Sequence, residues 1–167
     1  MEPQLLLDAC ERGDACGVQA ALLQGAKPGM SGTLGCAPLH LAVTVSGWDP
    51  PASVKIASIL INARACIDAR DGRSNTPLHY CAMYSQGGVW PGRLLLALGA
   101  DPMLCNGDGQ KPSDVVVLNP VGCKAADDFY VMCKCRESQI LEEAGVARHT
   151  RHLPARAAPS TNLWRLY

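Results

Sequence analysis

Two histidines are the first residues of this chain to raise the question of chemistry. His40 and His79 each close a Pro-Leu-His sequence, and a neutral imidazole can act as a general base or as a metal ligand. Catalysis needs partners at a recognisable spacing. No Ser-His-Asp or Cys-His set can be assembled, and there is neither a GxxxxGK(S/T) phosphate loop nor an HExxH zinc motif. We therefore predict that the protein is not an enzyme and uses no cofactor.

The cysteines raise the question of a metal site. Cys133-Lys134-Cys135 follows Cys123 by ten residues, and thiolates are common zinc ligands. Structural zinc usually uses two well-spaced pairs, whereas the spacing here is Cys-x-Cys and the nearest histidines, His149 and His152, lie in the C-terminal stretch. We predict no metal site, with redox sensing as the alternative to buried or incidental thiols.

The number of cysteines bears on the compartment. The nine cysteines are an odd number without the spacing of a disulfide framework. Such cysteines are typical of reduced thiols inside the cell, so we expect a cytoplasmic or nuclear protein.

Both histidines belong to a pattern that recurs in register. The copies are Gly25-Ala26 with Ala37-Pro38-Leu39-His40, Arg64-Ala65 with Thr76-Pro77-Leu78-His79, and Gly99-Ala100-Asp101 with Lys111-Pro112-Ser113-Asp114. In each copy, twelve positions separate the first residue of the leading pair from the first residue of the tetrapeptide. Thr76 is a favourable N-cap and Pro77 suits the first helical position, so a helix should begin at each tetrapeptide. Gly99 is typical of the end of the preceding helix, and Asp71-Gly72 indicates a tight turn between the two.

These motifs resemble the ankyrin repeat. The matching segments are APLHLA at 37–42, TPLHYCA at 76–82 and GADP at 99–102, with a period near 33 residues. The resemblance covers residues 4–145 and implies an all-α fold, an ankyrin-repeat solenoid of stacked helix-turn-helix units with short hairpin loops. It also implies a structural role, including hydrogen bonding between repeats, for the motif residues Pro38, Leu39, His40, Thr76, Pro77, Leu78 and His79.

The resemblance also divides the chain. We expect an ankyrin-repeat domain at 1–146, with units at about 4–26, 37–65, 76–100 and 111–145, followed by a basic, flexible tail at 147–167. Lys111-Pro112-Ser113-Asp114 lacks the Leu and His of the motif. We interpret this last unit as a degenerate cap, the alternative being a segment that folds differently.

The intervals between tetrapeptide and next leading pair are unequal. They are 21 residues from Gln4 to Gly25, 27 from Ala37 to Arg64, 23 from Thr76 to Gly99 and 34 from Lys111 to Gly145. We assign all the extra length to the turn between the paired helices. Those turns are then predicted to carry Trp48, Trp90 and Phe129. The aromatic side chains either grip a partner or fold back over the helix ends.

A stacked repeat array is usually a surface for binding other proteins. Hairpin tips and the exposed side of the first helices commonly form that surface in ankyrin proteins. Arg70 and Arg73 at a tip, with Met83 and Tyr84 on a first helix, are our predicted partner-binding residues, and Val45 is predicted to be exposed beside them. Trp48 and Trp90 are predicted secondary anchors. The alternative is ordinary surface or contact with a neighbouring repeat.

The predicted function is non-catalytic protein–protein interaction as an adaptor or scaffold. One alternative is an inhibitor of a partner enzyme such as a protein kinase, since the build is similar to that of ankyrin inhibitors of cyclin-dependent kinases. Another is a substrate-recruiting subunit of a ubiquitin ligase, although residues 146–167 show no convincing box for that purpose.

Charge and hydropathy restrict the partners. Fifteen basic residues balance fifteen acidic ones, which gives no electrostatic case for nucleic acid, and no apolar run is long enough to span a membrane. We expect a monomer in the absence of its partner. Acidic residues end at Glu143, and the basic tail closes with Leu163-Trp164-Arg165-Leu166-Tyr167, which we interpret as a short docking motif or an extra helix on the array.

Overall fold

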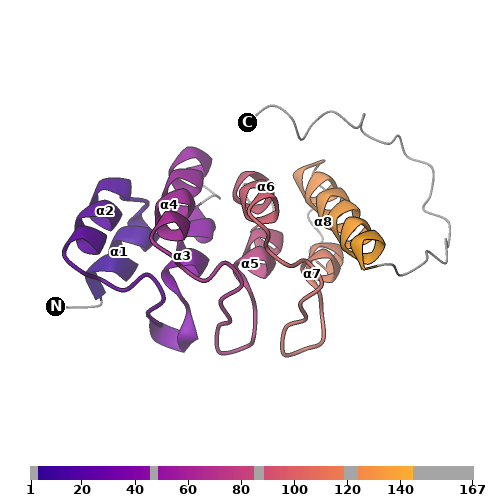
Figure 1. The fold of residues 1–167 in the computed structure, drawn as a ribbon, viewed down its shortest axis with the longest axis horizontal. Coiled ribbons are helices and arrows are strands. Elements are labelled where there is room, and N and C mark those ends of the chain that lie inside the picture. Colours follow the sequence, from indigo (N-terminus) through magenta and orange to yellow (C-terminus); the bar gives the residue numbers. More distant parts are fainter. Residues whose placement is uncertain (1–3, 46–48, 85–88, 119–123, 145–167) are drawn as a thin grey trace.

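The protein is a row of helix pairs stacked side by side (Figure 1). A computed structural model describes residues 4–45, 49–84, 89–118 and 124–144. The helices are α1 (Gln4–Arg12), α2 (Ala15–Leu23), α3 (Pro38–Thr44), α4 (Pro50–Asn62), α5 (Pro77–Met83), α6 (Val89–Ala97), α7 (Pro112–Leu118) and α8 (Lys124–Glu143), with a short 3₁₀ turn η1 (Thr33–Gly35). The described residues form helices and no strand, so the predicted all-α solenoid is confirmed.

The pairs have a consistent orientation. The first helices α1, α3, α5 and α7 form one layer, which we call inner, and α2, α4, α6 and α8 form the outer layer (Figure 1). Loops between successive pairs project together from the inner side. The sequence predictions for Trp48, Cys123 and the tail at 147–167 concern residues outside the described ranges.

Local sequence determines where the helices begin and end. Proline occupies the first helical position of α3, α5 and α7, where its missing N–H costs no hydrogen bond. The predicted start of α5, with Thr76 as N-cap and Pro77 next, is confirmed. The leading residues Gly25, Arg64 and Gly99 have φ of +89°, +70° and +95°, so each repeat leaves its outer helix through the same left-handed residue.

The core runs continuously through the stack between the two layers. Leu39 and Leu78 of the Pro-Leu-His motifs are fully buried, as are Ala42 and Ala82 one turn later. A small side chain at those positions lets neighbouring inner helices pack closely. Burying one leucine side chain stabilises the fold by about 2 kcal/mol. Because each repeat of a solenoid contacts only its neighbours, the array is held mainly by contacts between adjacent repeats.

The prediction that all the extra length lies in the turns between paired helices is right only in part, because the turn has two residues (13–14) in the first pair and five in each later pair. The connections between paired helices after the first pair are 45–49, 84–88 and 119–123, all of one length. What varies is the outer helix, which has 13 residues in α4, 9 in α6 and 20 in α8. Asp49 begins α4 early because its carboxylate accepts the Ala52 N–H at 3.0 Å and two prolines follow it.

The predicted loop positions of two aromatic residues are also wrong. Trp90 lies in the first turn of α6, and Phe129 lies inside α8. The Phe129 side chain is fully buried. A Cβ added at Gly92 would lie only 2.5 Å from Phe129 Cε2, so this glycine gives the ring its place against the backbone of α6.

Candidate functional site

The loops between helix pairs are joined to one another at their tips. The Gly72 N–H donates to the Leu34 carbonyl at 2.8 Å, and the Gly107 N–H donates to the Arg73 carbonyl at 2.8 Å. A Cβ at Gly72 would lie 2.8 Å from that Leu34 oxygen, so only glycine allows the approach. The tips of three successive repeats therefore form one connected edge.

The two motif histidines connect each repeat with the next. His40 Nδ1 accepts the Ala37 N–H at 3.1 Å, and its Nε2 lies 3.0 Å from the Asn75 carbonyl. His79 does the same, with Nδ1 accepting the Thr76 N–H at 3.1 Å and Nε2 lying 2.9 Å from the Gln110 carbonyl. Because Nδ1 accepts, the proton must be on Nε2, which donates forward to the following repeat.

Burial favours the neutral form of both imidazoles. Burial lowers the pKa of His40 and of His79 below the ordinary value of 6.5, outweighing the hydrogen bonds from the neighbouring backbone. Each ring has both nitrogens engaged with the chain and its side chain fully buried. The structure thus places these histidines in backbone contacts within and between repeats.

Tyr80 connects the loop edge with the inner helices. Its hydroxyl donates to Asp71 Oδ2 at 3.0 Å and lies 3.1 Å from Cys36 Sγ. Its ring packs edge-on against His40 at 5.0 Å and lies 6.4 Å from the Tyr84 ring. A continuous path of side chains therefore leads from the loop tips to the end of α5.

Three of the predicted partner-binding residues lie along this path. Arg73 is exposed at the second loop tip, and Met83 and Tyr84 are 38% and 47% exposed at the end of α5. Arg70 is exposed as well, but its Nη1 donates to the Cys105 carbonyl at 3.1 Å, so it also braces two loops. The predicted exposure of Val45 is wrong, because its side chain is buried where α3 ends.

Trp90 does not join this surface. It is 56% exposed on α6, in the outer layer, with the Arg93 guanidinium 5.6 Å from its ring centre. The structure thus separates Trp90 from Arg73, Met83 and Tyr84.

Sequence reasoning missed Leu34. This residue is 82% exposed at the first loop tip and has a φ of +59°, a conformation that costs a leucine about 1–2 kcal/mol. Its place between Thr33 and Gly35 in a turn was the available signal. We define the inner surface as Leu34, Arg73, Tyr80, Met83 and Tyr84.

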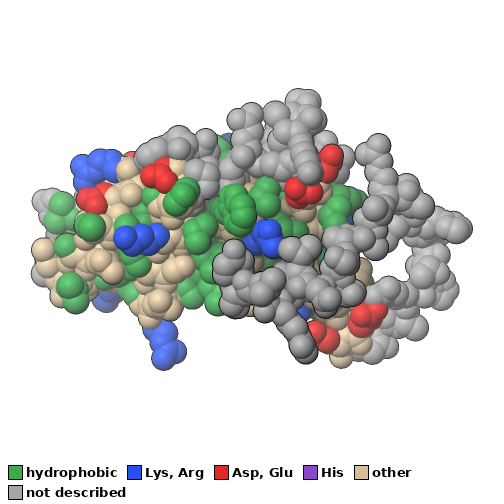
Figure 2. All heavy atoms as spheres, turned by 90° about the horizontal axis from the view of Figure 1, so that it is seen from above, with side chains coloured by type: hydrophobic (Ala, Val, Ile, Leu, Met, Phe, Trp, Pro, Cys, Tyr) green, Lys and Arg blue, Asp and Glu red, His purple; other side chains and the backbone are tan. Residues whose placement is uncertain are grey.

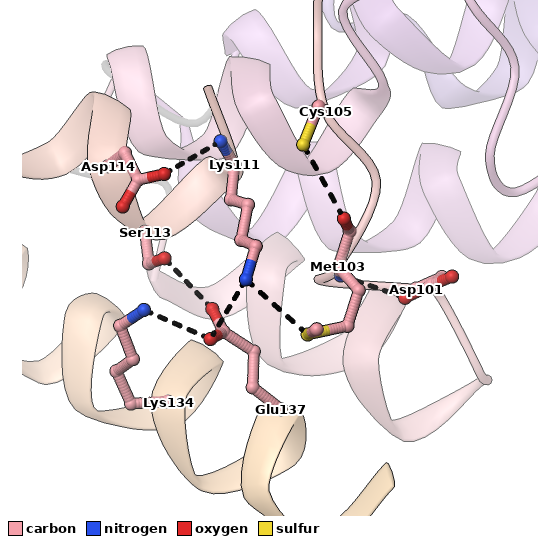
Figure 3. Close-up of polar contacts among 8 residues, drawn as sticks. All are labelled: Asp101, Met103, Cys105, Lys111, Ser113, Asp114, Lys134 and Glu137. Atoms are coloured by element: carbon pink, nitrogen blue, oxygen red, sulfur yellow. Dashed lines mark hydrogen bonds and ion pairs between the residues drawn. The ribbon is translucent and has the colours of Figure 1, made fainter. Parts of the chain in front are cut away.

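The last repeat replaces the histidine motif with a different set of contacts (Figure 3). Asp114 stands where the other repeats have histidine, and its carboxylate accepts the Lys111 N–H at 3.0 Å. Ser113 stands where they have leucine, and its hydroxyl donates to Glu137 Oε1 of α8 at 2.9 Å. Glu137 also pairs with Lys134 at 3.0 Å and Lys111 at 3.9 Å, so a nearly buried carboxylate joins α8 to α7.

The two cysteines of Cys133-Lys134-Cys135 point in different directions from α8. Cys133 is buried against the core and Cys135 is exposed, because residues two apart on a helix point in different directions. Burial raises the pKa of the Cys133 thiol to about 12, with Glu137 adding to the effect. Among the described residues, no three His, Cys, Asp or Glu side chains gather as a metal site would require.

Comparison with known proteins supports the ankyrin-repeat resemblance. The ankyrin-repeat family model matches residues 34–72. The chain is also similar to zinc finger CCCH domain-containing protein 50 of Oryza sativa subsp. japonica, with 29% identity over 126 residues. That match covers 73% of this chain and 18% of the rice protein, so the chain spans less than a fifth of that relative's length.

The family has a general role. Ankyrin repeats are protein–protein interaction modules and are typically non-catalytic. In the part of the chain that the structure describes, no helix is both long and apolar enough to cross a membrane. The matched repeat lies within a stack of helix pairs joined by backbone-linked loops, so the chain contains an ankyrin repeat, and the fold of the whole stack supports an ankyrin-repeat protein.

Proposed function

We propose that this protein is an adaptor or scaffold that binds another protein through its inner surface. The observation that carries the proposal is Leu34. A leucine that is 82% exposed and held at a positive φ contributes little to stability, and strained residues of this kind concentrate at functional sites.

The rest of the inner surface supports a protein partner. The path from Asp71 through Tyr80 to Tyr84 places aromatic and aliphatic side chains beside the exposed Arg73. Tyrosine and arginine are enriched among the residues that dominate binding energy at protein interfaces. The linked loop tips make this surface rigid before binding, which reduces the entropy lost on association.

Cytoplasm or nucleus is the compartment we propose. The cysteines in the described residues are unpaired thiols, four of them exposed, as expected where thiols stay reduced.

Quantitative affinity purification tests the proposal. Wild type would be compared with Met83→Ser/Tyr84→Ser and Arg73→Ala, and with the control Leu23→Ser, an exposed residue of α2 in the outer layer. We expect the inner-surface variants to lose a shared partner by tenfold or more, since truncating a hot spot costs about 2 kcal/mol. Equal recovery with all variants would contradict the choice of surface.

The purified partner then separates adaptor from inhibitor. Binding with the partner's activity unchanged supports an adaptor or scaffold. Binding that abolishes an enzymatic activity would instead indicate an inhibitor, of a protein kinase for example.

A further inference from the structure

The outer face of α6 is apolar although no described element covers it. We define the α6 stripe as Trp90, Leu94, Ala97 and Leu98, whose spacing places them on one side of the helix. Trp90 is 56% and Leu98 49% exposed, Ala97 is exposed as well, and Leu94 is half-buried against the core. Figure 2 looks onto the outer layer and shows hydrophobic side chains gathered where Figure 1 places α4 and α6.

Two acidic residues precede the α8 residue that packs on α6. Phe129 packs on the backbone of Gly92, so the second turn of α8 lies next to the first turn of α6. Asp127 and Asp128 precede Phe129 and are exposed. The Arg93 guanidinium lies 5.6 Å from the Trp90 ring centre, so the charge that favours a basic apolar segment is the net negative charge of the described array as a whole.

We propose that the α6 stripe binds residues 145–167 of the same chain, with Leu163, Trp164 and Leu166 as the apolar anchors. This segment has the matching chemistry. Only one of the fifteen acidic residues, Glu2, lies outside 4–144, whereas four of the fifteen basic residues lie in 145–167. The described array is thus net acidic, and the segment that follows α8 carries arginine and no acid.

The segment is long enough to reach the stripe. Eighteen residues lie between Ala144 and Leu163, a connection that can span about 60 Å when extended and about 25 Å as a flexible chain. The 20 residues of α8 are about 30 Å long, and packed helices lie about 8–10 Å apart. Every point of the stripe is therefore within reach.

Tethering removes the need for tight binding. A short flexible connection gives an effective concentration of about 1 mM, so a contact with a dissociation constant of about 0.1 mM would be closed roughly nine-tenths of the time. Two or three apolar anchors with a few arginines suffice for such an affinity.

Hydroxyl-radical footprinting of the full chain tests the proposal. Oxidation of Trp90 and Leu98 would be followed by mass spectrometry in wild type and in Trp164→Ser/Leu166→Ser, with Met83 as the reference on the inner surface. We expect oxidation of Trp90 and Leu98 to rise threefold or more in the variant while that of Met83 stays constant. Equal oxidation of the stripe in both proteins overturns the proposal.

Charge reversal gives a second measurement that does not depend on the anchors. Asp127→Lys/Asp128→Lys should expose the stripe to oxidation, and adding Arg148→Glu/Arg151→Glu should restore its protection. If charge reversal leaves the oxidation of the stripe unchanged, or if the added substitutions do not restore its protection, the assigned partner charges are refuted. All variants change exposed residues or the tail, and circular dichroism would verify their folding.

The other possible occupants give different results. A second copy of the chain would make protection depend on protein concentration and would double the mass in sedimentation. A separate partner protein would leave the purified chain unprotected and protect the stripe only when that partner is added. Either outcome overturns the intramolecular assignment.

Discussion

Acidification should destabilise the array through its two buried histidines. His40 and His79 have pKa values lowered by burial from 6.5, so the unfolded chain binds protons near pH 6 that the folded chain does not. The free energy of unfolding then rises with pH in this range, because the unfolded state binds more protons. Stability is therefore fully present above pH 6.5 and is lost as the pH falls below it.

The size of the effect follows from linkage. If the folded imidazoles stay neutral, lowering the pH from 7.5 to 5.5 costs each histidine up to about 1.4 kcal/mol, and the pair up to about 2.7 kcal/mol. Because burial lowers the pKa of both rings, the loss lies between zero and this upper limit.

Urea unfolding followed by circular dichroism measures this dependence. His79→Gln should halve the loss between pH 7.5 and 5.5, whereas the control His149→Gln/His152→Gln should leave it unchanged. The variant itself is less stable at neutral pH because the bond to the Gln110 carbonyl is weakened. If wild type and His79→Gln lose the same stability over this interval, the imidazole takes up its proton in the folded state and the reasoning fails.

Three further predictions concern packing and strain. Gly92→Val should lower the free energy of unfolding by about 1–3 kcal/mol, because the new side chain meets the Phe129 ring. The loss should be smaller in a Phe129→Leu background. A double-mutant cycle from thermal unfolding measures this coupling, and additive effects would contradict it. Glu137→Leu should lower the free energy of unfolding by about 1–3 kcal/mol. Ser113→Ala should lower it by about 1 kcal/mol in wild type but by almost nothing in the Glu137→Leu variant. The same Ser113→Ala penalty in both proteins would refute the contact between α7 and α8. Leu34→Gly should be about 1 kcal/mol more stable than Leu34→Ala, since glycine tolerates the positive φ, and should still bind the partner less well; equal melting temperatures would argue against strain at this position.

Much of the regular fold could be predicted because its causes are local. Thr76 and Pro77 begin α5 through capping and a fixed φ, and Gly99 ends a repeat by adopting a positive φ. Such features depend on neighbouring residues and can be read from the chain alone.

The errors arise where distant segments meet. Phe129 looked like a loop residue because nothing nearby in the sequence shows that Gly92 leaves room for its ring. Trp90 and Val45 were misplaced for a related reason: the helix boundary at Val89 and the burial of the α3 end depend on tertiary packing.

The candidate site was predicted in part. Arg73, Met83 and Tyr84 are exposed, but their role in binding stays a prediction. Tyr80, which connects them with the loops, was missed because its partners Cys36 and Asp71 come from two different loops. Leu34 was missed because its backbone conformation follows from the turn and not from its side chain.

The forward bond of each histidine gives the stack a direction along which it can be lengthened. His40 and His79 hold a carbonyl of the following repeat, whereas Asp114 satisfies only the backbone of its own. An engineer who duplicates the segment from Arg64 to Leu98 would therefore supply every new repeat with a donor behind it and a carbonyl ahead. A copy placed after α8 would lack that donor. The interior is thus an extensible module, and the forward bond that allows it to grow is missing where Asp114 replaces histidine.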